Sequence, residues 1–394
     1  MNIAFVSIGD PADPHYHSGR HHNIMRNLER AGFRVTVIGP LDRSLRWLYS
    51  PQKLFYKALS YEMQVDRHVL MRKWYALQIS RRITGEDVDI ILSPSTIPVS
   101  ELQCKQPIIT WTDASFALLD GYYGGAFSRP APLTRKAAYI QERASLRRAA
   151  AAIYSSDWAA DGTAEAYGVP RGKIAVIPSG PYLEIAHTSE DIQVWIERRL
   201  TSSRLRLLFV GQDWGRKGGP IALETTRLLN EYGIPAELVI VGCDPGEARA
   251  SPYVDIKGFI KKTERTGLRM IQELFASCHM LILPTLADAS PNVIAEAAAF
   301  GLPVIARDTG GVSTYLRDGV NGILMGQSAS PHDYAERIRE LWADLRRYSD
   351  MARGSYKHYE KELSWRAAIG KFGVLAEQVM REKELSDLRG SSQW

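Results

Sequence analysis

Residues 280–303, MLILPTLADASPNVIAEAAAFGLP, hold the pattern that decides the fold. The apolar run Met280–Leu283 is short and closed by a proline, which predicts a buried strand of a parallel sheet. After a turn, Ser290 can cap a helix, and Pro291 suits the first helical position, where no N–H is needed. We expect the helix to cover Asn292–Phe300 and to end at the glycine that follows. The stretch is therefore a strand, a turn and a helix, the repeating unit of a doubly wound α/β sheet.

Two acids flank the start of this helix. Asp288 precedes the helix and Glu296 lies within it. The free N–H groups at a helix N-terminus attract anions, phosphate above all. Carboxylates beside a phosphate site suit hydroxyl groups, such as those of a ribose or a hexose. For either acid alone, the alternative is an ordinary solvated carboxylate; the ordered combination favours the binding site.

The segment from Asp288 to Glu296, DASPNVIAE, resembles the E-x7-E motif of the family-4 retaining glycosyltransferases, with aspartate in the first position. The resemblance implies that Asp288 contacts the donor sugar, as a catalytic candidate, and that Glu296 holds the ribose. Backbone groups between the two acids meet the donor in this family. The matching donor-binding candidates here are Ser290, Pro291, Asn292 and Val293. The family commonly has Phe-Gly where this chain has Pro291-Asn292, so the donor sugar stays open.

The same resemblance predicts the domain organisation. The family has the α/β GT-B fold: two Rossmann-like, doubly wound parallel-sheet domains face a central cleft, and a C-terminal helix crosses back to the first domain. A chain of 394 residues suits two domains. Residues 178–181, Pro-Ser-Gly-Pro, are the clearest break, where relatives usually carry Pro-Asn-Gly at the hinge. We expect an acceptor-side domain at residues 1–180, completed by a helix at about 364–394, and a sugar-nucleotide domain at residues 181–363.

Composition excludes several other classes. With 45% hydrophobic and 24% charged residues, the chain has a normal soluble profile, and no apolar run nears the length of a membrane span. Residues 1–9 lack the basic start and long apolar core of a signal peptide. Three cysteines at unrelated spacings predict neither a disulfide framework nor a zinc site, which fits a reducing cytoplasm. No G-x-G-x-x-G follows the first strand, so no nicotinamide or flavin cofactor is expected. Residues 87–89, Asp-Val-Asp, lead into a strand, and we treat their match to a D-x-D metal motif as chance.

A second glycine-rich loop follows the predicted strand Leu205–Val210. Its sequence, GQDWGRKGGP, ends in two cations and a helix start marked by proline, which favours a phosphate site. It resembles the family's lysine-glycine phosphate loop, which makes Lys217 the expected pyrophosphate contact. Relatives often have arginine where this chain has Gln212, and Arg216 is the candidate that supplies the missing charge. The alternative is a solvated Arg-Lys pair.

Three further positions follow from the resemblance. Gly19 matches the glycine of the loop that closes over the donor phosphates and the acceptor, although a tight turn alone would also need glycine. Ile260 lies in the loop that holds the nucleotide base. Many relatives carry a histidine after the strand that here is Ile108–Thr110. This chain has none there, and Asp113 is the nearest polar candidate for contact with the acceptor or the sugar, our second catalytic candidate.

Residues 43–82 are basic and aromatic. They contain nine Lys or Arg residues against two acids, interleaved with aromatic residues such as Trp47 and Phe55. Large amphipathic aromatics among basic residues suit an anionic membrane surface. A second basic run covers Arg135–Arg148. The alternative is a solvated pair of helices whose aromatic residues join the core.

These observations together predict a metal-independent, retaining glycosyltransferase without an organic cofactor. It would move a hexose-type sugar from a nucleotide-diphosphate sugar, UDP-sugar favoured over GDP-sugar, to a glycan, a glycolipid or a small hydroxyl acceptor. Helix N-termini and Lys217 would stabilise the negative charge that grows on the leaving diphosphate. We expect a role in bacterial surface polysaccharide or glycolipid synthesis, in the cytoplasm or peripherally on the inner face of the plasma membrane, and no nucleic-acid partner. The alternatives are a sugar-nucleotide-binding protein without transferase activity, and a GT-B epimerase or phosphorylase.

Overall fold

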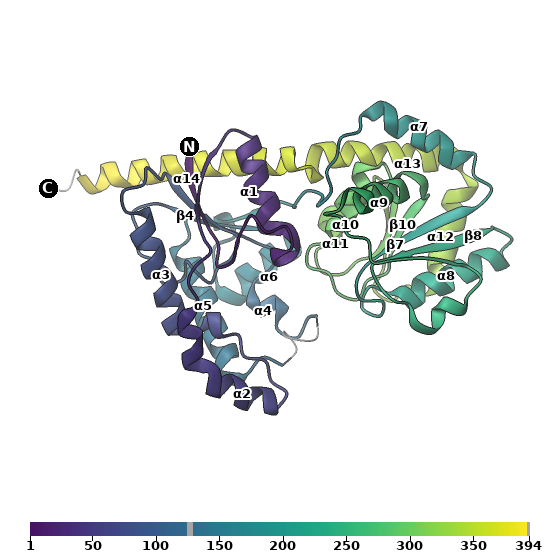
Figure 1. Ribbon diagram of the computed structural model, residues 1–394. Helices are drawn as coiled ribbons and strands as arrows, with labels where there is room; N and C mark the ends of the chain where they lie inside the picture. The colour runs from purple at the N-terminus through teal and green to yellow at the C-terminus, as the bar shows by residue number, and fades with distance from the viewer. Residues whose placement is uncertain (124–128, 392–394) are drawn as a thin grey trace. The chain divides into compact units, whose positions relative to one another are not determined.

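The computed structural model describes residues 1–123 and 129–391. The chain forms two compact units (Figure 1): unit 1 contains Met1–Ile177 and Ile369–Trp394, and unit 2 contains Pro178–Ala368. Residues 392–394 of the predicted C-terminal segment lie outside the described residues. The roles that the resemblance gives to the two domains, acceptor side and donor side, stay predictions.

Unit 1 is built on a parallel sheet with the strand order β2-β1-β3-β4-β5-β6. Every residue of β3, β4 and β5 is buried, as expected for strands that are covered on both faces. These short buried runs are the apolar segments that the sequence predicts as strands. The strands are β1 (Asn2–Val6), β2 (Arg34–Ile38), β3 (Ile90–Ser93), β4 (Ile108–Thr112), β5 (Ala151–Tyr154) and β6 (Ile174–Val176).

Helices pack against both faces of this sheet. On one face, α3 contributes Tyr75 and Ile79 to a core shared with Val6 of β1. The helices of unit 1 are α1 (Arg20–Arg30), α2 (Ser50–Ala58), α3 (Val69–Ile83), α4 (Phe116–Leu119), α5 (Pro132–Arg148) and α6 (Asp157–Tyr167). Short 3₁₀ segments are η1 (Tyr16–Gly19), η2 (Ser44–Tyr49), η3 (Val65–Arg67) and η5 (Arg171–Lys173).

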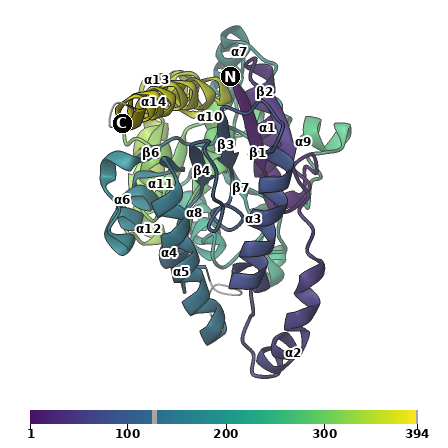
Figure 2. The same ribbon diagram turned by 90° about the vertical axis from the view of Figure 1, so that its left-hand side faces the viewer.

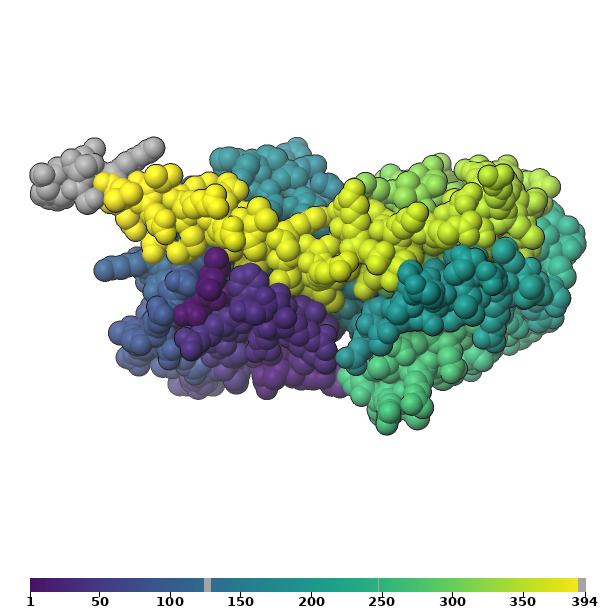
Figure 3. Space-filling view, turned by 90° about the horizontal axis from the view of Figure 1, so that it is seen from above, coloured from purple at the N-terminus to yellow at the C-terminus, as the bar shows by residue number. Residues whose placement is uncertain are grey.

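The C-terminal helix α14 (Trp365–Ser391) begins in unit 2 and continues into unit 1. Within unit 1, the ring of Phe372 stacks on Trp111 of β4 and meets Phe33 edge-on. Figure 3 shows the yellow helix running beside the purple N-terminal segment. This helix therefore completes the core of unit 1 on the sheet face opposite α3.

Unit 2 also has a parallel six-stranded sheet, in the order β12-β11-β10-β7-β8-β9. Alternate residues of β7 enter two different cores: Leu207 faces one and Leu208 faces the other. The strands are β7 (Leu205–Val210), β8 (Ala236–Val241), β9 (Val254–Gly258), β10 (Met280–Leu283), β11 (Val304–Arg307) and β12 (Gly322–Met325). Two such sheets confirm the doubly wound α/β fold that the sequence predicts.

Asp344 separates two helices of unit 2. It leaves helical geometry (φ −114°, ψ 85°), and its side chain accepts a hydrogen bond from the Arg347 N–H. Asp344 thus ends one helix and caps the next. The helices are α7 (Ser189–Leu200), α8 (Gly219–Glu231), α9 (Arg265–Ser277), α10 (Asn292–Ala299), α11 (Val312–Tyr315), α12 (Pro331–Ala343) and α13 (Leu345–His358), with a 3₁₀ segment η6 (Gly246–Ala250) and a π-helical turn η7 (Tyr359–Leu363). In the part of the chain that the structure describes, no helix has both the length and the apolar character that crossing a membrane requires.

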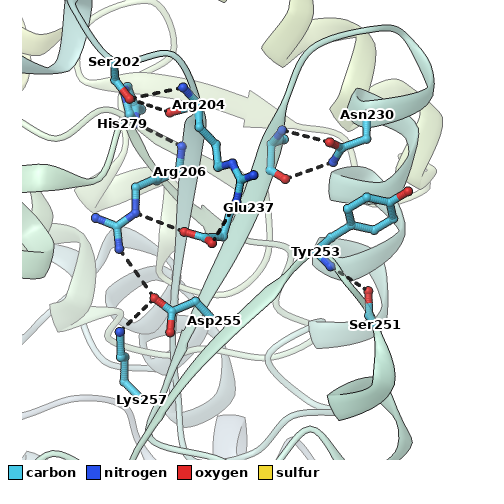
Figure 4. Close-up of polar contacts among 11 residues, drawn as sticks. Ser202, Arg204, Arg206, Asn230, Glu237, Ser251, Tyr253, Asp255, Lys257 and His279 are labelled. Atoms are coloured by element: carbon cyan, nitrogen blue, oxygen red, sulfur yellow. Dashed lines mark hydrogen bonds and ion pairs between the residues drawn. The ribbon is translucent and has the colours of Figure 1, made fainter.

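Charged residues join the amino ends of three strands of unit 2 (Figure 4). Arg206 of β7 lies 3.2 Å from Glu237 of β8 and 3.7 Å from Asp255 of β9. Lys257 adds a 2.8 Å ion pair to Asp255. At the amino ends of these three strands, the charged side chains are thus paired with one another. The polar residues predicted to bind the donor lie at the opposite, carboxyl edge.

Candidate functional site

The candidate site lies in unit 2 where the order of strands reverses. β10 pairs with β7, and successive strands then run outward from this pair in both directions. In doubly wound sheets, ligands bind at the carboxyl ends of the strands at such a switch point. The loop after β7 and the loop after β10 meet here, and both carry residues that the sequence singles out.

Lys217 and Asp288 form the centre of the site. Lys217 Nζ lies 2.5 Å from Asp288 Oδ2, and their side chains are only 14% and 8% exposed. The sequence predicts Lys217 for the pyrophosphate and Asp288 for the sugar, and the structure places the two in one ion pair. A buried carboxylate needs such a partner to remain charged. The site therefore presents a paired cation and acid at the switch point.

Arg216 links the loop after β7 to the loop after β10 by hydrogen bonds. Its Nη1 donates to the Ala287 carbonyl at 2.7 Å, and its own carbonyl accepts from the Leu286 N–H at 2.8 Å. Gly218 has a φ of +79°, and a Cβ there would lie 2.1 Å from the Pro284 carbonyl oxygen, so only glycine fits. These hydrogen bonds of Arg216 thus stabilise the loop that carries Lys217. Its predicted contact with the donor stays a prediction.

The start of α10 differs from the prediction for Ser290 and Pro291. Pro291 is the cap residue rather than the first helical residue, and no side chain caps the helix there. The Ser290 hydroxyl instead lies 3.0 Å from the hydroxyl of Tyr315, a fully buried side chain that also accepts the Ser179 N–H. The prediction that Ser290 caps this helix is wrong because the buried Tyr315 hydroxyl engages it. Asn292 and Val293 begin the helix as predicted, with their N–H groups in its first turn.

Glu296 has a partner that the sequence did not reveal. Lys262 Nζ lies 2.7 Å from both carboxylate oxygens of Glu296, whose side chain is 3% exposed. Lys262 belongs to the segment between β9 and α9, 34 residues before Glu296. No local spacing marks such a contact. The two motif acids are therefore each held by a lysine from another loop.

The loop after β9 carries the residue predicted for the nucleotide base. Ile260 is only partly exposed and packs against the core of unit 2. Its neighbour Phe259 is exposed, and it follows Gly258, whose φ is +66°. The structure thus adds Phe259 as an apolar surface in this loop. Contact of Ile260 with a base stays a prediction.

The remaining predicted residues, Gly19 and Asp113, lie in unit 1. Gly19 has a φ of +83° just before α1, and a Cβ there would lie 2.8 Å from the Pro14 carbonyl oxygen. The residues before it, His17 and Ser18, also have left-handed backbones, which is costly for residues other than glycine. The local backbone alone accounts for Gly19, and a contact with the donor stays a prediction.

Asp113 lies beside a buried arginine. Arg20 Nε is 3.4 Å from Asp113 Oδ1, and Ser155 donates to the same carboxylate oxygen at 3.0 Å. Arg20 also donates to the Trp111 carbonyl at 2.6 Å, which fixes α1 to the end of β4. The Asp113 side chain is still 41% exposed, so it can meet a ligand. No pattern in the sequence marks Arg20 as a partner of Asp113.

Histidines also gather in unit 1, although none follows β4. The rings of His17 and His21 stack in parallel, with centroids 4.9 Å apart. His21 is buried beside Ser7, and burial lowers its pKa to about 2, so its ring is neutral. Burial also lowers the pKa of His17, and the charge of Asp113 opposes that effect. The signal that could have found them is the unusual run of histidines around Gly19.

The structure separates the predicted residues into two groups. Unit 2 brings Lys217, Arg216 and Asp288 together and carries Glu296 on the adjacent helix; unit 1 carries Gly19 and Asp113. Within residues 1–123 and 129–391, no group of three or more His, Cys, Asp or Glu side chains is arranged to hold a metal ion. The charged groups that unit 2 places at the site, Lys217, Asp288 and Glu296, suit a phosphorylated sugar.

Comparisons with known proteins agree with this chemistry. A family model described as Glycosyltransferase Family 4 matches residues 21–184, and one described as Glycosyl transferases group 1 matches residues 204–344. D-inositol 3-phosphate glycosyltransferase of Paenarthrobacter aurescens is 26% identical over 239 residues, 59% of this chain and 58% of that protein. The protein of the same name from Thermomonospora curvata is 27% identical over 227 residues, 52% of this chain and 51% of that protein. The match thus spans a little over half the length of these relatives.

Solved structures show the same fold. Sucrose-phosphate synthase of Thermosynechococcus elongatus superposes with a TM-score of 0.66 at 16% identity, over 97% of this chain and all of that one. HepE of Anabaena, solved with UDP and glucose, gives 0.61 at 15% identity, over 96% of this chain and all of that one. These likenesses show the GT-B fold. The two family models together match residues 21–184 and 204–344, well over half of the chain, so the chain belongs to the family-4, or group 1, glycosyltransferases.

Proposed function

We propose that this protein transfers a sugar from a nucleotide-diphosphate sugar to a hydroxyl acceptor, with retention of anomeric configuration. The observation that carries the proposal is the pairing of Lys217 with Asp288 at the switch point of unit 2, next to the helix that bears Glu296. This arrangement offers a cation for a diphosphate and carboxylates for the hydroxyls of a sugar and a ribose.

The chemistry follows from where charge develops. As the bond between sugar and diphosphate breaks, negative charge grows on the leaving diphosphate. Lys217 and the positive end of the α10 dipole are in place before the bond breaks and stabilise that charge. Once the diphosphate engages Lys217, the Asp288 carboxylate can accept hydrogen bonds from the transferred sugar. The leaving phosphate would take the acceptor proton, so no metal ion is assigned a role.

UDP-sugars are the proposed donors, ahead of GDP-sugars. A structurally similar protein, HepE of Anabaena, is solved with UDP-glucose, which supports this choice at the level of the fold. The experiment is titration calorimetry with UDP and GDP in the presence of EDTA. We expect UDP to bind more tightly than GDP without metal, and a protein that binds neither nucleotide would contradict the proposal.

The assay products separate this proposal from its alternatives. A transferase releases UDP only as sugar moves to an acceptor or to water. An epimerase returns an isomeric UDP-sugar, and a phosphorylase needs inorganic phosphate. A protein that binds UDP-sugars and yields none of these products is a binding protein.

We further propose that residues 43–82 bring unit 1 to an anionic membrane that carries a lipid-linked acceptor. Figure 2 shows α2 projecting from the lower end of unit 1. Leu54 and Phe55 on this helix are 71% and 60% exposed, and Lys53 and Lys57 beside them are exposed as well. Exposed apolar side chains between cations are what an anionic bilayer surface binds.

Part of this basic segment belongs to the core instead. Tyr75 is fully buried and donates to Asp66, and the buried Arg67 and Arg72 pair with acids in unit 1. The aromatic and basic residues therefore divide between the two alternatives that the sequence left open. The membrane proposal rests on η2 and α2, with Trp47, Leu54 and Phe55 exposed.

A further inference from the structure

The ion pair between Lys262 and Glu296 differs from the other lysine–acid pair of the site. Lys217 donates to one oxygen of Asp288, whereas Lys262 Nζ lies 2.7 Å from both oxygens of Glu296. Lys262 lies in the loop after β9, and β9 is the edge strand on the side of the sheet opposite β12. Its side chain is 33% exposed, while that of Glu296 is 3% exposed. The lysine thus reaches from solvent down to a buried carboxylate.

This geometry fixes the orientation of the Glu296 carboxylate. A buried charge is costly unless an opposite charge pairs with it. An ammonium that bridges both oxygens provides that pairing and sets the plane of the carboxylate. Each carboxylate oxygen has two lone pairs, so each can still accept one more hydrogen bond. Two adjacent hydroxyls can therefore add to Glu296 while Lys262 stays in place.

We infer that Lys262 is a positioning residue, which holds the Glu296 carboxylate ready to accept hydrogen bonds from the 2′- and 3′-hydroxyls of a nucleotide's ribose. The inference rests on the proposed function, in which Glu296 binds the ribose. It makes Lys262 a determinant of selectivity for ribonucleotides over deoxyribonucleotides. A lysine that only attracts phosphate would strengthen the binding of ribo- and deoxyribonucleoside diphosphates by the same factor.

The chain provides a matched control one residue away. Lys261 pairs with Glu264 at 3.0 Å, and both of these side chains are exposed. Lys261→Met removes the same charge from the same loop without touching Glu296. Lys262→Arg keeps a charge that can bridge both carboxylate oxygens.

The test measures dissociation constants for UDP, 2′-deoxy-UDP and 3′-deoxy-UDP by titration calorimetry. We expect the wild-type protein to prefer UDP by about tenfold over each deoxy analogue, the value of one charge-assisted hydrogen bond. Lys262→Met should bring the dissociation constants of the three nucleotides to within about twofold of one another, because a Glu296 carboxylate that Lys262 no longer orients gains little from the hydroxyls. Lys262→Arg should keep most of the preference, and Lys261→Met should keep all of it. Melting curves check folding, and Lys262→Gln repeats the test if the methionine variant is unfolded.

The outcomes separate this inference from the proposed function. If Lys262→Met keeps the preference for UDP, or weakens the binding of all three nucleotides by the same factor, the inference is wrong. The role of Glu296 is tested independently by Glu296→Gln, which should lose the preference whatever Lys262 does. A wild-type protein that binds UDP without any preference for the ribose hydroxyls would contradict the proposed role of Glu296, and the inference with it.

Discussion

Lys217 Nζ lies 2.5 Å from Asp288 Oδ2, although 71 residues separate them in the chain. Their strands β7 and β10 are neighbours where the strand order reverses, so the loops that follow them meet. On the proposed function, an entering diphosphate competes with Asp288 for Lys217. Binding of the donor would thereby release the acid that contacts the sugar.

Lys217→Ala should weaken UDP binding. The change removes a charge-assisted contact to phosphate, worth roughly 1.5–3 kcal/mol. Titration calorimetry with UDP measures the loss, and Lys217→Arg is the control that keeps the charge. An unchanged dissociation constant in the alanine variant would show that the diphosphate binds elsewhere.

The two motif acids should differ in which ligand they affect. Glu296→Gln should weaken binding of UDP itself, since the ribose is common to donor and product. Asp288→Asn should spare UDP affinity and lower turnover of the UDP-sugar, because only the donor carries the transferred sugar. Equal losses of UDP affinity in both variants would contradict this division.

His279 should make unit 2 less stable in acid. It is buried, its Nδ1 accepts the Arg206 N–H, and its Nε2 lies 3.0 Å from the Arg199 carbonyl, which requires the neutral ring. Burial lowers its pKa from 6.5 to about 4. Between pH 6.5 and pH 4 the unfolded chain therefore binds a proton at His279 that the folded chain does not, and stability falls as the pH falls.

The loss in the free energy of unfolding that His279 causes is expected to be at most about 3 kcal/mol, fully present at pH 4 and absent above pH 6.5. Calorimetric unfolding of wild type and His279→Asn across this range isolates the contribution, because asparagine can accept from the Arg206 N–H and does not titrate. The stability advantage of the wild type should shrink as the pH falls. An advantage that stays constant from pH 7 to pH 4 would show that folding does not lower the pKa of His279.

Vesicle binding tests the membrane proposal. Co-sedimentation should require anionic lipid and weaken as salt rises, since each Lys or Arg near such a surface contributes on the order of 1 kcal/mol. Replacing Leu54 and Phe55 with serine should weaken binding further by removing apolar insertion. Val374→Ser is the control, because that side chain is equally exposed on α14. Failure to bind anionic vesicles at low salt would favour a soluble acceptor.

Several strands could be predicted from the sequence because they are short buried apolar runs, unlike the partly exposed edge strands β2 and β9. Met280–Leu283, for example, has the predicted bounds. The boundary between α12 and α13 at Asp344 is not visible in the sequence, since an aspartate within a helical pattern is an ordinary surface residue until its side chain caps the next helix. The role of Ser290 was wrong, because a residue distant in the sequence, Tyr315, engages its hydroxyl.

Only part of the candidate site could be predicted from local patterns in the sequence. Glycine-rich loops and the spacing of Asp288 and Glu296 are local patterns, and the structure brings Lys217 and Asp288 from these segments together. The partners of those acids are not local: Lys262 reaches Glu296 from another loop, and no spacing in the sequence connects them. Contacts of this kind depend on strand order, which a single sequence reveals only through resemblance to a family.

The most direct test of the central claim, sugar transfer at the Lys217–Asp288 site, is UDP release from a panel of UDP-sugars in EDTA, with and without candidate acceptors. The wild-type protein should release UDP from at least one UDP-sugar without metal, with retained configuration in the product. Asp288→Asn should bind UDP at least as tightly as the wild type, because no carboxylate then competes for Lys217, and should release at least tenfold less UDP, the effect of losing about 1.4 kcal/mol of transition-state stabilisation. UDP release that is unchanged in Asp288→Asn, or that depends on added metal, would contradict the account.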